Sequence, residues 1–311
     1  HIVCSRDQAD GAPAPALQPL QTFWRSGERN QPGDGAMPED FRAMLIHASA
    51  FNADAEKRAA PISAHPGLSA DPAADAGAIE RLFRAADWLA IHFQRRVLLA
   101  MRGLYSMAAL MAIAFTVYDN LPAHDDMIYV FLLLFALGGF LVVLANRRGW
   151  HRKYLDYRAL AEGLRVQWYW RRVGLALAGD AEFARDNFLQ KQDVELGWVR
   201  DAMRSAELES AMRDIADTER EIAAVVREWV GNAQHGGQLD YYRRKAAQRA
   251  RTHRFTETID AASLCVGIAI SIVLAAFAVH LSADTKNDLV VVMAVFSIVA
   301  RVRTAYAYKQ A

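Results

Sequence analysis

Residues 127–145 read MIYVFLLLFALGGFLVVLA, nineteen residues without Lys, Arg, Asp or Glu. An α-helix rises about 1.5 Å per residue, so this stretch is long enough to cross the apolar layer of a bilayer, which is roughly 30 Å thick. Three further windows lack all four charged residue types, at 103–118, 261–281 and 289–300. Charged residues make up 23% of the chain, and their exclusion from these windows predicts four membrane-spanning helices.

Charges beside the first two spans predict their orientation. The first span (residues 98–118) and the second (residues 127–146) are joined by a short connection that carries three aspartates and no basic residue. Basic residues cluster instead at the outer ends of the pair: Arg95 and Arg96 before the first span, Arg102 one turn inside that end, and Arg147, Arg148, Arg152 and Lys153 after the second span. Because basic residues near span ends stay in the cytoplasm, these spans are predicted to form a hairpin inserted from the cytoplasmic side.

The last two windows repeat this arrangement. Basic residues precede residues 261–281 and follow residues 289–300, and a short outer loop at 282–288 joins them. The final window is only twelve residues long, but Arg301 and Arg303 can extend their charged ends to the interface and lengthen the span. The predicted fold is an all-α integral membrane protein with four transmembrane helices in two hairpins, a helical cytoplasmic layer and cytoplasmic termini.

Proline is confined almost entirely to the first part of the chain. Eight of nine prolines lie at or before Pro72, and proline is poorly tolerated inside helices. A proline and two acids at the start of residues 38–52 predict one short helix there, and the segment from His1 to Cys4 is expected to be the last strand of an upstream domain. The expected divisions are a Pro/Gly-rich linker within residues 1–79, a transmembrane hairpin at 80–148, a cytoplasmic helical region at 149–258 and a second transmembrane hairpin at 259–311.

The region between the hairpins carries no proline and many charges. We expect residues 149–178 to continue the second span and Gly179-Asp180 to end that helix. Asp180 is expected to cap a second helix that runs on to Val199, a third helix to begin near Ser210, and Gly236-Gly237 to form the last turn before the third span. Five carboxylates could be assembled into an acidic site, but acids on exposed helices are interpreted as a solvated face. They are Asp180, Glu182, Asp186, Asp193 and Glu195.

Catalytic and metal-binding patterns are missing from the sequence. There is no phosphate-binding loop, dinucleotide fingerprint or HExxH motif, and the two cysteines, Cys4 and Cys265, are too far apart to form a zinc-ligand pair. The prediction is a protein that is not an enzyme and has no metal site.

Small residues recur at every fourth position of the third span: Ser263, Gly267, Ser271 and Ala275. Such spacing lines one helix face with small side chains and lets another helix approach closely. The partner helix could belong to another subunit or to the same chain, and the sequence leaves both readings open.

Polar side chains form a stripe on the last span. Ser297, Arg301 and Thr304 are spaced by four and three residues, and Tyr308 extends the stripe. Ionisable groups at membrane depth usually face cavities or other polar groups, so these residues and, more weakly, Arg102 on the first span are pathway candidates. The alternative is an interfacial arginine, with hydroxyl groups bonded to their own helix.

A basic cluster precedes the third span: Arg243, Arg244, Lys245, Arg249, Arg251 and Arg254. The formal net charge of the chain is only +1, which argues against nucleic acid as a main partner. Anionic lipid headgroups attract such residues by about 1 kcal/mol each near the surface. The preferred interpretation is therefore that the cluster contacts lipid headgroups.

Two segments carry a resemblance to a known family. Residues 150–170 read WHRKYLDYRALAEGLRVQWYW, and Trp229-Val230, Gln234, Gln238, Tyr241-Tyr242 and Lys245-Ala246 precede the third span. These patterns resemble the bacterial SLATT-type membrane effectors, in a tandem four-span form that covers about residues 80–311. The resemblance implies transmembrane hairpins with long cytoplasmic helices in the bacterial inner membrane.

The same resemblance implies a function. An upstream SLOG-type domain, similar to the ligand-sensing region of TRPM channels, would bind a nucleotide-derived signal such as ADP-ribose or a cyclic nucleotide, and His1-Ile2-Val3 would be its remnant. The chain is then expected to be a homo-oligomeric pore in antiphage or conflict defence, with no cofactor of its own. The alternative is a non-conducting membrane anchor and oligomerisation platform for the sensor.

Overall fold

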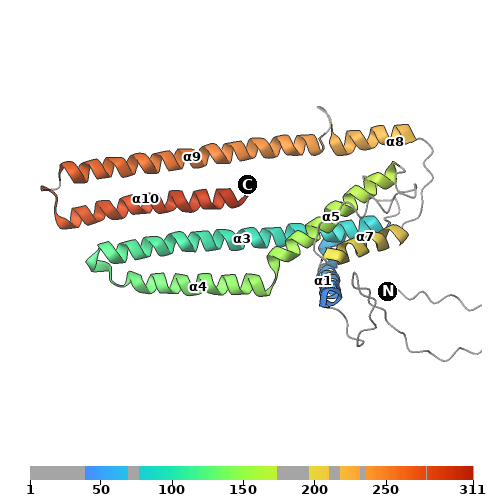
Figure 1. The fold of residues 1–311 in the computed structure, drawn as a ribbon, viewed down its shortest axis with the longest axis horizontal. Coiled ribbons are helices and arrows are strands. Elements are labelled where there is room, and N and C mark those ends of the chain that lie inside the picture. The colour runs from blue at the N-terminus through green and yellow to red at the C-terminus, as the bar shows by residue number, and fades with distance from the viewer. Residues whose placement is uncertain are drawn as a thin grey trace, which may run out of the picture.

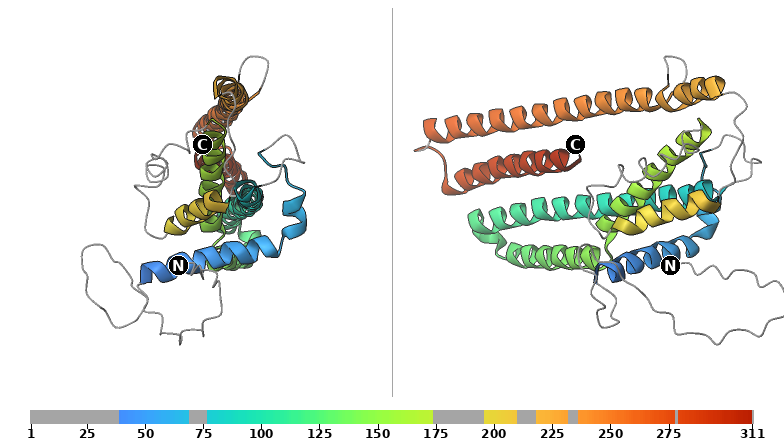
Figure 2. Two further views of the ribbon diagram at one scale, coloured as in Figure 1. Left: turned by 90° about the vertical axis from the view of Figure 1, so that its right-hand side faces the viewer. Right: turned by 45° about the vertical axis from the view of Figure 1, so that its right-hand side comes forward.

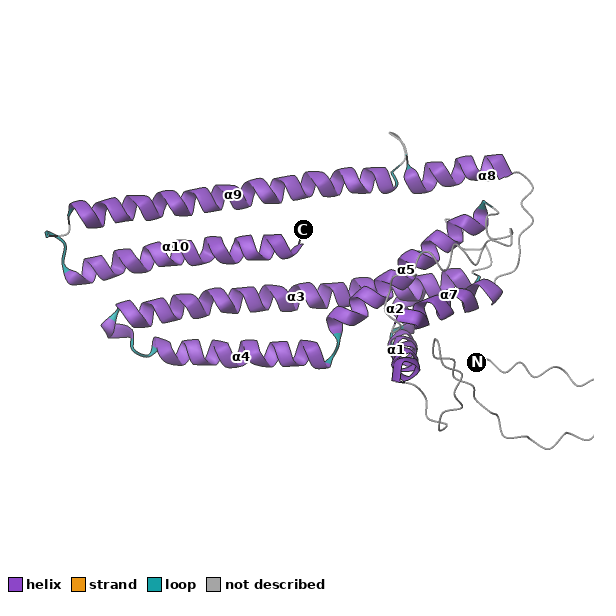
Figure 3. Ribbon diagram, in the orientation of Figure 1, coloured by secondary structure: helices purple, strands orange, loops and turns teal. Residues whose placement is uncertain are grey.

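The computed structural model describes residues 39–68, 77–173, 196–209, 218–231, 236–277 and 279–310. These residues form helices joined by turns, and no strand occurs among them (Figure 3). The helices are α1 (Glu39–Glu56), α2 (Ala59–Ser63), α3 (Ala78–Asn120), α4 (Met127–Arg147), α5 (Trp150–Arg172), α7 (Gly197–Glu209), α8 (Thr218–Val225), α9 (Gln238–Ala276) and α10 (Ala283–Gln310), with short turns η1 (Pro122–His124) and η3 (Val226–Val230).

Several predicted features lie outside the described residues. They are the linker before residue 39 with its N-terminal strand, the helix break at Gly179-Asp180, the five carboxylates between residues 180 and 195, and the helix start near Ser210.

Four of the helices are long and apolar enough to cross a membrane, as predicted. They are α3, α4 with its continuation α5, α9, and α10 up to residue 307. These helices lie side by side in the order α4, α3, α10, α9, and the view along their axes shows a single row (Figures 1 and 2). Only 6% of each apolar window is buried within the chain, so both faces of the row remain available to lipid or to further copies.

Turn residues explain where these long helices end. Leu121 adopts an extended conformation (φ −121°, ψ 94°) after α3, because the following Pro122 disfavours helical geometry at the residue before it. Gly149, with φ +58° and ψ 31°, separates α4 from α5. This left-handed conformation suits glycine, and it interrupts the expected continuation of the second span so that α5 departs at an angle (Figure 1).

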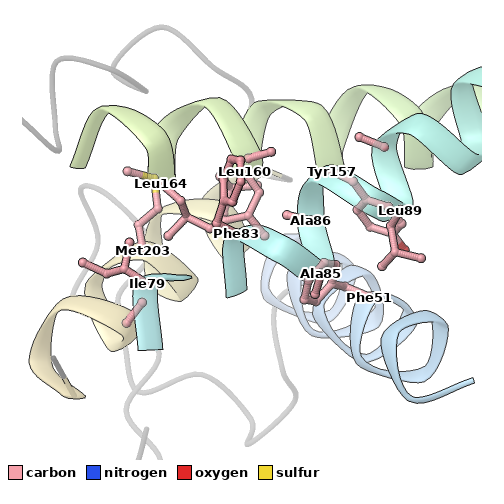
Figure 4. Packing of buried hydrophobic residues seen from close by; sticks show 14 of the residues in the cluster. Phe51, Ile79, Phe83, Ala85, Ala86, Leu89, Tyr157, Leu160, Leu164 and Met203 are labelled. Atoms are coloured by element: carbon pink, nitrogen blue, oxygen red, sulfur yellow. The ribbon is translucent and has the colours of Figure 1, made fainter. Parts of the chain in front are cut away.

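A hydrophobic core lies at one end of the row, where α1, the first half of α3, α5 and α7 pack together (Figure 4). We call this assembly the core unit. Leu89, Leu160 and Leu164 are fully buried in it, and Phe51 packs edge-on against Tyr157 with ring centroids 5.2 Å apart. Since α3 belongs both to the core unit and to the row of apolar helices, one rigid helix joins the two parts.

Candidate membrane pathway and its helix contacts

The polar stripe predicted on the last span lies on α10, which packs between α3 and α9. Ser297 is exposed, and its hydroxyl donates to the backbone oxygen of Met293 in the same helix at 3.0 Å. Arg301 is also exposed and forms no ion pair with another described residue. Ser297 and Arg301 therefore lie on an open side of the row, whereas the next stripe residue, Thr304, turns inward.

Thr304 contacts a carboxylate of the neighbouring helix. Its Oγ1 lies 3.0 Å from Oδ1 and 2.9 Å from Oδ2 of Asp260 on α9, and 3.0 Å from the backbone oxygen of Ala300. The hydroxyl has one proton and donates to one of these oxygens at a time. This contact joins the last charged residue before the apolar part of α9 to the polar C-terminal end of α10.

Asp260 was not singled out from the sequence. The sequence feature that could have identified Asp260 is its position three residues before Ser263, since residues three or four apart share a helix face. Thr256, one turn earlier, is buried at 8% exposure, and Ser263 is buried at 9%. The small-residue face of α9 therefore begins earlier than predicted, with Thr256 and Asp260.

That small-residue face is turned largely toward α10. A Cβ added at Gly267 would lie 3.9 Å from Cγ of Met293, and the Ser271 hydroxyl lies 3.9 Å from the Met293 sulfur. Ala275 is exposed. Three of the four predicted packing residues thus have a neighbour within the same chain or are buried by it, whereas Ala275 remains open.

Arg102 lies apart from the stripe but reaches the same end of α10. Its Nε donates to the hydroxyl oxygen of Tyr306 at 2.7 Å, and the ring of Tyr105 packs edge-on against Tyr306. On the other side of α10, the Arg303 guanidinium lies 4.4 Å from the ring centroid of Phe255 on α9. Polar and aromatic contacts therefore tie the end of α10 to both of its neighbours.

The predicted basic cluster lies on the first half of α9, and all six of its residues are exposed. Arg244 pairs with Asp240 at 3.1 Å, one turn earlier on the same helix, and Lys245 lies over the Tyr241 ring. The remaining four arginines, at positions 243, 249, 251 and 254, form no ion pair with any described residue. The cluster is thus a solvated helix surface within one chain.

The core unit holds one charged cluster that couples α1 to α5. Asp54 of α1 accepts hydrogen bonds from Lys153 Nζ at 2.6 Å and from the Tyr157 hydroxyl at 2.9 Å, and it pairs with Arg58 at 2.9 Å. Burial by itself raises the pKa of Asp54, but the hydrogen bonds and the charge of Lys153 outweigh it, so the pKa lies below its ordinary value. The carboxylate is therefore charged at neutral pH and holds the two helices together.

Comparisons with known proteins add no relative: no family model, no curated protein and no solved structure matches the chain. The described part of the chain holds no group of three or more His, Cys, Asp or Glu side chains arranged to bind a metal ion. The candidate site is therefore defined by the contacts of α10 and by the open polar side of the row.

Proposed function

We propose that the chain is the membrane part of an oligomeric pore or channel-like effector. The observation that carries this proposal is the single row of four apolar helices, which buries only 6% of each apolar window. A single row of helices encloses no channel, so a pathway for ions requires several copies. Ser297 and Arg301 are exposed on α10, and polar side chains at membrane depth favour a polar or aqueous neighbour over lipid.

The proposed topology is two hairpins inserted from the cytoplasmic side of a bacterial inner membrane, with both termini in the cytoplasm. Its support is the charge distribution, because basic residues flank the outer ends of both helix pairs while the connection between α3 and α4 carries aspartates. In this orientation the core unit lies in the cytoplasm.

The proposed gating route runs through α3. This helix of 43 residues begins in the core unit and ends in the apolar row without a break. The linker helix α1 packs on α3 and α7. A sensor upstream of α1 would therefore move the first half of α3, and the continuous helix would transmit this movement to the apolar row. Following the resemblance to SLATT-type effectors, we propose a nucleotide-derived signal such as ADP-ribose or a cyclic nucleotide, and a role in antiphage or conflict defence.

Efflux from liposomes tests the proposal. Full-length protein, including any sensor domain, is reconstituted with trapped ions or dye, and release is measured with and without a panel of nucleotides. We expect ligand-dependent release that falls at least tenfold when Ser297→Leu and Arg301→Ala are combined. The matched control is Val299→Leu, an exposed apolar position of the same helix, which should conduct normally. Silence across the panel from a correctly inserted protein would contradict the proposal.

A non-conducting anchor is the second candidate, and one observation favours it. The Ser297 hydroxyl already donates to Met293 in its own helix, so it needs no aqueous neighbour. Replacement of residues 289–300 by leucine separates the candidates, because an anchor needs only apolar spans. A pore would lose its flux, whereas an anchor would still assemble and hold the sensor at the membrane.

A further inference from the structure

The first half of α9, residues 238–255, is almost uncovered by the described part of its chain: its start contacts η3, and Phe255 at its end lies against Arg303 of α10. We call it the basic arm. Every residue from Tyr241 to Phe255 is exposed, although apolar side chains such as Leu239 and Tyr242 lie among the charges. Isolated helices of this length are only marginally stable in water. A binding partner would therefore stabilise the arm as well as cover it.

The straight course of α9 raises most of the arm above a membrane surface. α9 continues without a break from Gln238 to Ala276 (Figure 1), and its last charged residue before the apolar part is Asp260. At about 1.5 Å per residue, Arg254 lies about 9 Å from Asp260 along the axis and Arg243 about 26 Å. The headgroup layer is only about 5 to 8 Å thick on each side.

The direction of the side chains increases this separation. In a helix the Cα–Cβ bonds tilt toward the N-terminus, and the N-terminus of α9 is the end remote from the apolar segment. Arg243, Arg244 and Lys245 therefore lean away from the lipid. Headgroup contact fits Arg254 and, at the end of α4, the exposed pair Arg147 and Arg148, but not the outer part of the arm.

Charge indicates which partner fits the arm. The arm has six basic residues and one acidic residue, whereas α7 and α8 together have five acidic and three basic residues. Two acids of that region, Asp201 on α7 and Glu219 on α8, are exposed and form no ion pair with another described residue. The chain thus carries a basic surface and a surface of opposite charge at the same end of the row.

Among the described residues of one copy, the arm forms no ion pair with an acidic residue of α7 or α8. In the described part of the chain, α7 packs against α1, α3 and α5, whereas α9 packs chiefly against α10 and contacts η3 near its start. α8, η3 and α9 follow one another along nearly one line (Figures 1 and 2), so the acids of α8 lie beyond the arm and not beside it. A neighbouring copy in the same membrane could bring its acidic surface alongside the arm.

We infer that the basic arm docks on the acidic α7–α8 surface of a second copy of this chain. This inference rests on the proposed function, because it supplies one contact of the proposed oligomer. Charged interfaces of this kind fix the register between partners and weaken with salt.

The test measures assembly and not conduction. Two differently tagged copies of the full chain are reconstituted together in phosphatidylcholine liposomes, which carry no net lipid charge, with Cys4 and Cys265 replaced by Ser. Tyr242→Cys in one copy and Ser205→Cys, an exposed α7 position, in the other should form a disulfide between the tags. A pair made of Tyr242→Cys and Tyr129→Cys, at the opposite end of the row, should not.

Charge reversal then tests whether attraction between the basic arm and the acidic residues of α7 and α8 causes the cross-linking. The triple change Arg243→Glu, Arg244→Glu, Lys245→Glu should lower the cross-linked fraction at least fivefold. Adding Asp201→Arg and Glu219→Arg to the same chain should restore it to within twofold, which excludes misfolding as the reason for the loss. Reversal of Arg147 and Arg148, as a matched control, should leave cross-linking unchanged.

Three results would overturn the inference: an unaltered cross-linked fraction after reversal of the arm, a disulfide formed only within one copy, or assembly that requires phosphatidylglycerol and is not restored by the compensating changes. The last result would assign the arm to lipid headgroups. Failure of the proposed function is distinguishable, because a wild-type protein that cross-links through the arm and never releases dye would retain the interface without the pore.

Discussion

The two pairs of long helices differ in what their charged extensions do. The first half of α3 buries Ile79, Phe83 and Phe93 in the core unit, whereas the first half of α9 buries nothing before Thr256. Both extensions are charged helices that lead into an apolar span. The difference lies in the apolar stripe, which recurs at helical spacing on α3 and is reduced to scattered side chains on α9. The α3 pair therefore carries its own core, whereas the first half of α9 has no core among the described residues.

The largest change in stability is expected from a cavity-forming substitution in the core unit, to which α3 and α5 belong. Leu160→Ala should lower the free energy of opening of α5 by about 3 kcal/mol, because Leu160 has 0% exposure and its loss leaves a cavity. Hydrogen exchange of α5 amides in the full chain measures this. Leu155→Ala, on the exposed side of the same helix, should change it by less than about 0.5 kcal/mol. Equal effects would contradict the assigned core.

The Asp54 cluster should make the stability of the core unit depend on pH in the acidic range. Asp54→Asn should destabilise the contact of α1 with α5 by about 2 kcal/mol at pH 7, because it removes charged hydrogen bonds. The folded pKa of Asp54 is depressed, so its contribution is present above the unfolded pKa of about 3.9 and is lost as the pH falls through the lower folded pKa. Hydrogen exchange of wild type and variant should converge in acid, and a constant difference would contradict this assignment.

The turn at Gly149 distinguishes the two helix pairs, because α4 bends into α5 whereas α9 runs straight. Gly149→Ala should lower stability by about 1 kcal/mol, since φ is +58° there and a side chain is unfavourable in the left-handed region. Gly139 lies inside α4, and a Cβ added there would meet no atom within 4 Å. Gly139→Ala should therefore be neutral or stabilising. Thermal unfolding of the full chain compares the two, and a similar melting temperature for both variants would refute the role of the turn.

The smallest effect is expected at the contact that joins α9 to α10. Asp260→Ala and Thr304→Val, combined in a double-mutant cycle, should reveal a coupling of about 0.6 kcal/mol, which is typical of hydrogen bonds between membrane helices. Unfolding in mixed micelles measures each variant. Strict additivity of the two changes would show that this contact does not link the helices energetically.

The sequence predicted the features that local residue types determine. Uncharged windows predicted the four long helices, and α9 begins directly after the predicted turn at Gly236-Gly237. The order of the helices in the row was not predictable, because apolar side chains face lipid and neighbouring helices alike and leave no periodic signal. Asp260 was missed for a related reason: a single carboxylate at a span boundary resembles any interfacial charge until its partner on α10 is known.

We propose that one copy is an incomplete membrane structure and that several copies form the pathway. The test is the rate of dye release from liposomes as a function of the number of copies per vesicle, measured with the full-length protein in the presence of the nucleotide panel. We predict a steep dependence, with almost no release from vesicles that hold a single copy. Release that rises linearly from one copy per vesicle would contradict a pathway formed by several copies.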